Sequence, residues 1–120
     1  MSTQNPKVQR KKLTHSELAN VIALHERYRT GKPGGVRAML AFADLAGMAM
    51  AGANLTEADC TGASFRGAML SDCVFDRAAL FACDFREADL EGASLMRADL
   101  RGACLRGANL TRAKIGRAHV

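Results

Sequence analysis

The chain has 120 residues, 48% of them apolar and 24% charged, and a formal net charge of +5. This length allows one ordinary domain and little more. No apolar run approaches the length of a membrane-spanning helix, and the charges are interspersed, which excludes both a membrane protein and a wholly disordered chain. The N-terminus lacks the apolar stretch of a secretory signal, so we expect a bacterial-type cytoplasmic protein with reduced cysteines.

Residues 1–12 are polar and basic, and we expect them to form a disordered tail. Residues 1–37 carry a net charge of +6, from eight basic and two acidic residues. A pI of about 9.4 for the whole chain therefore reflects this segment, and it does not indicate a basic binding surface on the rest.

Residues 13–31 carry the signals of an α-helix. Thr14 followed by Glu17 forms a T-x-x-E capping box, and Leu13 can pack against Leu18 across the first turn. Gly31 and Pro33 predict the end of the helix. One face of this helix is formed by Leu18, Val21, Ile22, His25 and Tyr28. Residues 32–37 are then a linker.

From residue 38 to residue 112 the chain reads in fives, as in Ala88-Asp-Leu-Glu-Gly92 and Ala98-Asp-Leu-Arg-Gly102. This segment holds fifteen consecutive pentads without an insertion, and each has a large apolar residue or cysteine at a position that we call i. Position i−2 is Ala in 12 of the 15 pentads, and position i+2 is Gly in seven. A period of five fits two inward residues separated by one outward residue, followed by a two-residue turn.

The pentads resemble the A(D/N)LXX repeats of the pentapeptide-repeat family, over about five-eighths of the chain. The stretch from His25 to Ala38 also resembles the lead-in segment of many members. The resemblance implies an all-β solenoid, a right-handed quadrilateral β-helix with four pentads per coil and positions i and i−2 inside. Fifteen pentads would give just under four coils, and the preceding helix would be an N-terminal cap over the open edge.

The resemblance also explains the 22 alanines of this chain. Eight inward side chains per coil would share a narrow prism, so only every second one can be large.

The last residues, from Lys114 to Val120, match the in-frame translation of a common sequencing-library adapter. We therefore expect residues 113–120 to be a non-native tail and the chain to be an N-terminal fragment of a longer protein. The alternative is that the tail is genuine, because Ala113 and Ile115 keep the phase of the pentads. In either case we expect further coils or a second chain at the C-terminal edge, where no capping helix follows Leu110.

Residues 20 apart should stack in columns, and one outward column contains Arg66, Arg86 and Arg106. Neighbouring guanidinium groups repel unless an anion or a carboxylate lies between them. Asp84 and Glu87 in the flanking columns could neutralise this column, which would then be a solvated charged face. The alternative is a contact with an anion or a partner.

Phe42 and Phe81 fall at outward or corner positions on one side of the expected prism. They either pack beneath the N-terminal helix or form an apolar interface patch.

Nothing in the sequence predicts a catalytic, cofactor or metal site. Three of the four cysteines, Cys60, Cys73 and Cys83, are at inward positions and only Cys104 is outward. The histidines lie outside the repeat, and no nucleophile–base pair, phosphate loop or metal-ligand spacing occurs.

We therefore expect a non-enzymatic β-helical scaffold or protein-interaction module. The alternative is a DNA mimic that inhibits or protects a type II topoisomerase such as DNA gyrase, as some members of the family do. That mechanism requires rows of exposed carboxylates. Residues 38–95 have a net charge of −6, which favours mimicry, but residues 96–112 have +3, which opposes it. Direct nucleic-acid binding through the basic N-terminus is not expected, because no aromatic stacking platform accompanies it.

Overall fold

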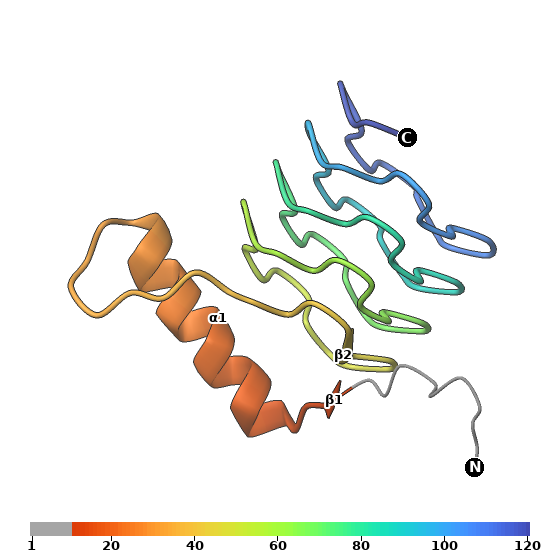
Figure 1. Cartoon of the computed structure of the whole chain (residues 1–120). Coiled ribbons are helices and arrows are strands. Elements are labelled where there is room, and N and C mark those ends of the chain that lie inside the picture. Colours follow the sequence, from red (N-terminus) through yellow and green to blue (C-terminus); the bar gives the residue numbers. More distant parts are fainter. Residues whose placement is uncertain (1–10) are drawn as a thin grey trace, which may run out of the picture.

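The computed structural model describes residues 11–120. Two short strands and one helix have regular bounds: β1 is Lys11–Lys12, α1 is His15–Arg29 and β2 is Ala43–Asp44. From residue 38 onward the backbone winds in successive coils that stack on one another, and α1 lies beside the first of them (Figure 1).

The coils are held together by parallel backbone pairing at a constant interval. Thirteen isolated parallel bridges join residues 20 apart, from Met39↔Asp59 to Asp99↔His119. Around each bridge, N–H groups donate to carbonyls of the next coil, as Leu40 does to Asp59 at 2.7 Å and Phe42 to Thr61 at 2.8 Å. One coil is therefore four pentads.

A tight turn separates consecutive pentads. In the first, the Ala43 N–H donates to the Leu40 carbonyl at 3.0 Å, and Phe42 has a positive φ of 60°. A positive φ at the third residue of such a turn is the type II geometry. All sixteen i+2 positions from residue 42 to residue 117 have a positive φ, although only seven of them are glycine.

The Asp or Asn at position i−1 closes these turns. Its side-chain oxygen accepts the backbone N–H two residues later, as Asp59 does from Thr61 at 3.1 Å. The same bond is made by Asp44, Asn54, Asp84, Asp89, Asp99 and Asn109. The N–H at i+1 points away from the ladder, so this Asx turn supplies the acceptor that the backbone does not. This explains why the repeat favours Asp or Asn at that position.

The interior alternates large and small side chains as the sequence predicted. The large residues at i are buried from Leu40 through Leu100, and the i−2 residues between Ala58 and Ala98 are buried with them. Phe65 and Phe85, one coil apart, stack with ring centroids 5.1 Å apart, and Phe75 meets both rings edge-on.

The three inward cysteines are buried thiols, and Cys104 is exposed, as expected. Two of them bond to the backbone: the Cys73 thiol donates to the Met50 carbonyl and the Cys83 thiol to the Cys60 carbonyl, both at 2.9 Å. Burial raises the pKa of Cys60 well above its ordinary value and the pKa of Cys73 to about 11.

The helix begins as predicted. Thr14 is the N-cap, and its capping box with Glu17 is complete in both directions. Hydrogen bonding to the Thr14 backbone lowers the pKa of Glu17. Leu13 and Leu18 are buried and join the same apolar core as the coils, with Val21 and Ile22 partly buried beside them.

Two segments differ from the expected boundaries. Lys11 and Lys12, placed by the sequence in the basic tail, form β1 and pair in parallel with Ala43 and Asp44 of β2. A two-residue strand has no alternation by which a sequence could reveal it. The remainder of the expected tail, residues 1–10, lies outside the described residues. Residues 113–120 continue the ladder through Ser94↔Lys114 and Asp99↔His119; their non-native origin stays a prediction.

Candidate interaction surfaces

The 20-residue period arranges the outward side chains on four corners. We number the corners by their turns in the first coil: residues 41–42, 46–47, 51–52 and 56–57, each continued at intervals of 20. Outward residues on one corner are thus separated by about 4.8 Å per coil.

The predicted arginine column lies on the second corner. Arg66 and Arg106 are exposed, whereas the side chain of Arg86 is only 35% exposed. Arg86 makes a bidentate ion pair with Asp84, with Nη2 at 2.8 Å from Oδ2 and Nε at 2.9 Å from Oδ1. The hydrogen bond from Arg86 lowers the pKa of Asp84, and the charge of Arg66 adds to this effect. Of the two flanking carboxylates that the sequence suggested could neutralise this column, Asp84 pairs with Arg86, whereas none of the ion pairs of residues 11–120 involves Glu87.

Phe42 and Phe81 lie on the first corner and are 48% and 46% exposed, so α1 does not cover either of them completely. The Phe42 ring lies directly over Gly62, where an added Cβ would come within 2.5 Å of the ring. The Arg101 guanidinium lies over the Phe81 ring at 6.0 Å from its centroid. The two rings are thus fixed by neighbouring coils and leave about half of each side chain accessible.

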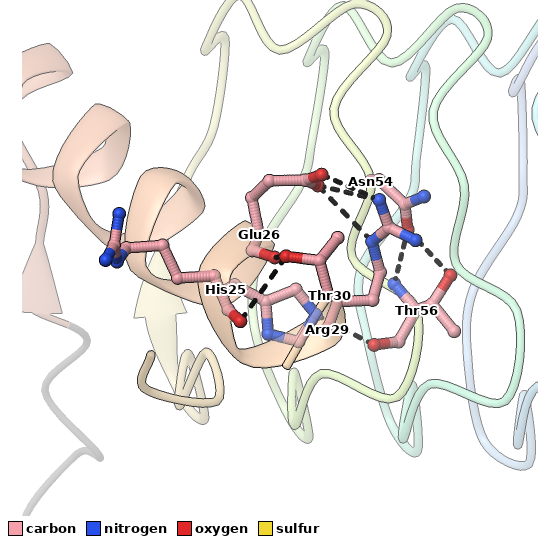
Figure 2. Close-up of polar contacts among 7 residues, drawn as sticks. His25, Glu26, Arg29, Thr30, Asn54 and Thr56 are labelled. Carbon is pink, nitrogen blue, oxygen red and sulfur yellow. Dashed lines mark hydrogen bonds and ion pairs between the residues drawn. The ribbon is translucent and has the colours of Figure 1, made fainter. Parts of the chain in front are cut away.

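The end of α1 docks on the fourth corner through a buried histidine (Figure 2). His25 is 0% exposed; its Nε2 is 2.8 Å from the Thr56 carbonyl oxygen, and its Nδ1 accepts the Ala38 N–H at 2.9 Å. Because Nδ1 accepts, the proton of the neutral ring is on Nε2, which donates to Thr56. Sequence reasoning placed His25 on the apolar face of the helix but did not find this role.

Further contacts fix the chain between α1 and the first coil. Arg37 donates from Nε to the Glu57 carbonyl at 2.7 Å. On the helix itself, Arg29 pairs with Glu26 at 2.8 Å, and the Thr30 hydroxyl donates to the Glu26 carbonyl (Figure 2). The Arg37 bond ties the segment after α1 to the fourth corner, and the two bonds to Glu26 stabilise the last turn of the helix itself.

A polar recess of about 320 Å³ opens beside this contact, lined by Tyr28, Arg37, Glu57 and Arg77. The sequence showed Arg77 and Arg97 in one column below Glu57, but only the structure brings Tyr28 and Arg37 to that column. Two apolar recesses border the helix as well. One, of about 630 Å³, lies between residues 12–15 and residues 46–48, and the other, of about 210 Å³, is lined by Val21, Leu24 and residues 36–39.

Within residues 11–120 there is no group of three or more His, Cys, Asp or Glu side chains arranged to hold a metal ion. In the same part of the chain, no helix is long and apolar enough to cross a membrane.

The 20-residue ladder, the type II turns and the alternating interior agree with the comparison of the chain to protein families. The family model described as "Pentapeptide repeats" matches eight copies, over residues 36–72 and 73–112. The chain belongs to the pentapeptide repeat family. The right-handed quadrilateral β-helix of that family is accordingly the architecture of this solenoid.

Solved structures of other pentapeptide repeat proteins resemble the chain. One is HetL, a protein involved in heterocyst differentiation regulation from the cyanobacterium Nostoc sp. strain PCC 7120: it is 34% identical, with a TM-score of 0.51, over 69% of this chain and 45% of HetL. The chain thus spans less than half the length of HetL. Another is alr5209 from Nostoc PCC 7120, also 34% identical, with a TM-score of 0.41, over 83% of this chain and 77% of that protein. A comparison with curated protein sequences finds no match.

Proposed function

We propose that this pentapeptide repeat domain is a non-enzymatic scaffold that binds another protein through outward side chains of its coils. The observation that carries the proposal is the rigid presentation of Phe42 and Phe81 on one corner, half exposed and held by Gly62 and Arg101. Exposed aromatic rings in fixed positions provide the apolar anchors of protein interfaces at little cost in side-chain entropy.

Within this proposal α1 acts as the cap of the N-terminal edge. It covers the first coil with Leu18 and is fastened by His25 at the fourth corner, while β1 pairs with β2. Covering a sheet edge in this way prevents the uncontrolled pairing that exposed ladder groups invite. Fifteen pentads at four per coil give just under four coils, or roughly 18 Å of stacked repeat.

The arginine column of the second corner is a further proposed contact. Arg66 and Arg106 remain exposed on either side of the Arg86–Asp84 pair, and they could meet carboxylates of the partner. At the other end of the solenoid, the partly exposed residues Leu105 and Leu110 would be covered by further coils or by a second chain.

Site-specific photo-crosslinking in the native host tests the proposal. A photoreactive residue at Phe42 and another at Phe81 should give adducts with the same protein, whereas one at Ala51, exposed on the third corner, should not. The proposal is wrong if none of the outward positions on the four corners gives a discrete adduct.

A DNA supercoiling assay with gyrase separates this proposal from topoisomerase mimicry. We expect neither inhibition nor protection, because Arg66, Arg86 and Arg106 interrupt the acidic surface that a DNA mimic needs. Inhibition at micromolar protein would favour the mimic instead.

A further inference from the structure

The fourth corner differs from the other three in the residues at its strained turn positions. Each corner has four i+2 residues with positive φ, and on three corners at least one of these is glycine. The fourth corner has none: its residues are Glu57, Arg77, Arg97 and Arg117, with φ of 67°, 57°, 60° and 60°.

Positive φ carries a conformational cost for residues other than glycine, Asn and Asp. Glycine at the same turn position is common in this chain, as at Gly47, Gly52 and Gly62, so the geometry itself does not require a side chain. Local strain that is retained is characteristic of functional sites, where the side chain is needed for contact with a ligand. The charged column of the fourth corner keeps a positive φ at every turn without using glycine, so its side chains are candidates for a contact with a ligand.

The arginines of this column are also free to bind. Among the four ion pairs of residues 11–120, none involves Arg77 or Arg97, whereas Arg86 on the second corner is engaged by Asp84. Arg37 donates from Nε to the Glu57 carbonyl. This bond holds the guanidinium group in place, and its two terminal nitrogens remain available for a ligand. Arg37 and Arg77 line the same recess as Tyr28, which adds a hydroxyl group.

We propose that the fourth corner, formed by Arg77 and Arg97 together with Arg37 and Tyr28, binds an acidic segment of the protein partner. Guanidinium groups bind carboxylates bidentately, and a column with a step of about 4.8 Å presents them along a straight line to an extended chain. Glu57 at the top of the column ends the basic stretch and would meet a basic residue or an amino group of the segment.

The observations favour an acidic peptide over a nucleic acid. Tyr28, the single tyrosine of the chain, is the only aromatic residue lining this recess, whereas proteins that bind single strands use several stacking platforms.

Fluorescence anisotropy with a labelled peptide of about eight glutamates, at an ionic strength of about 50 mM, tests the proposal. The full chain should bind the peptide saturably, and a glutamine peptide of the same length should not bind. The double variant R77Q/R97Q should bind the glutamate peptide at least about tenfold more weakly.

The matched control is R101Q/R112Q, which removes the same charge from the first and third corners, where Arg101 pairs with Asp99 and Arg112 pairs with Glu91. It should bind as the wild type does, and because both variants keep the basic residues 1–37, a contribution of that segment cancels. Equal loss in both variants would show attraction by net charge alone and would overturn the proposal. Absence of binding by the wild type would do so as well. A thymidine oligonucleotide that binds more tightly than the peptide, and is lost in R77Q/R97Q, would assign the corner to nucleic acid instead.

The variant R77G/R97G separates a binding role from a structural one. It should lose the peptide as R77Q/R97Q does, while its Tm rises by about 4 °C because glycine relieves the positive φ. If the arginines are kept for binding at a cost in stability, their replacement by glycine should weaken peptide binding and raise the Tm. A lower Tm in the glycine variant would mean that the arginines stabilise the turn, and the argument from strain would fail.

This inference rests on the proposed interaction function, and the two can fail separately. If the protein that crosslinks at Phe42 and Phe81 still does so in R77Q/R97Q with undiminished yield, the scaffold function stands and the fourth corner is not its acidic-segment site. If no outward position crosslinks, the scaffold function itself is wrong.

Discussion

The two ends of the solenoid are built from the same pentads but are stabilised differently. At the N-terminal end, α1 and β1 cover the first coil, and Leu45 there is 0% exposed. At the other end, Leu105 and Leu110 occupy the equivalent position i but are only partly buried. The backbone follows the same division: the Leu45 N–H donates to the Ser64 carbonyl at 2.8 Å, while within residues 11–120 the Leu105 and Leu110 N–H groups have no ladder acceptor.

The difference shows that the burial and backbone pairing of a repeat depend on its neighbours. An inward leucine is fully buried only when a coil or a helix lies on both sides of it, because each coil contacts only the adjacent ones. We therefore expect a gradient of stability along the stack, with the last pentads opening most readily.

Truncation of equivalent leucines should give the largest difference in stability between the two ends. Leu45→Ala should lower the free energy of unfolding by about 2–5 kcal/mol, because it leaves a cavity in the buried interior of the first coil. Leu110→Ala, the same change at the open end, should cost about 1 kcal/mol or less, since water already reaches this side chain. Chemical denaturation of both variants measures the difference, and equal costs would contradict the gradient.

His25 tests whether α1 is fastened to the coils by its polar contacts as well as by Leu18. His25→Ala leaves the Ala38 N–H and the Thr56 carbonyl without their partner in a buried site, and we expect a loss of about 2–3 kcal/mol. Hydrogen exchange should then show faster opening of residues 38–40 in particular.

The control for this variant is His119→Ala, an exposed histidine of the open end, with an expected change within about 0.5 kcal/mol. If His25→Ala is equally mild, the helix is held by its apolar face alone.

Enlarging an inward alanine compares the width of the prism in the middle of the stack with its width at the C-terminal end. Ala63 is 0% exposed between two coils, so Ala63→Leu should overpack the interior and cost about 1–3 kcal/mol. Ala103 has the same position in its pentad but is partly buried, and Ala103→Leu should be close to neutral. Thermal unfolding of the pair provides the measurement; a neutral Ala63→Leu would mean that the interior can expand.

The period of five and the family resemblance together predicted most of this architecture. The period indicated the two inward positions and the turn where φ can be positive, and so the three inward thiols. The four pentads per coil that the resemblance implies placed Arg66, Arg86 and Arg106 in one column. The capping box of Thr14 and Glu17 was equally explicit, since it is a local signal.

The contacts of α1 could not be predicted, because no period relates the helix to the coils. Whether Phe42 lies beneath the helix depends on where the helix axis crosses the first coil, and in the structure the helix ends at the fourth corner instead. For the same reason the sequence showed Arg77 and Arg97 in a column but not Arg37 and Tyr28 beside it. The ion pairs could not be predicted from the sequence either, since Arg86 pairs with a carboxylate in the structure and the other two arginines of its column do not.

The smallest expected effect is an alkaline loss of stability from the buried thiols. The pKa of Cys73 is raised to about 11 by burial, whereas an unfolded thiol has a pKa of about 9. A raised pKa stabilises the protonated folded form, so its contribution is complete below pH 9 and is lost as the pH rises from about 9 to about 11. At pH 10 this loss is about 1.4 kcal/mol, one pKa unit of differential ionisation. Cys73→Ala, which restores the usual residue of that pentad position, should flatten the pH dependence by this amount. Cys104→Ala, at the exposed thiol of the open end, should leave it unchanged, and equal effects of the two substitutions would show that the interior around Cys73 is as accessible to hydroxide as the surface.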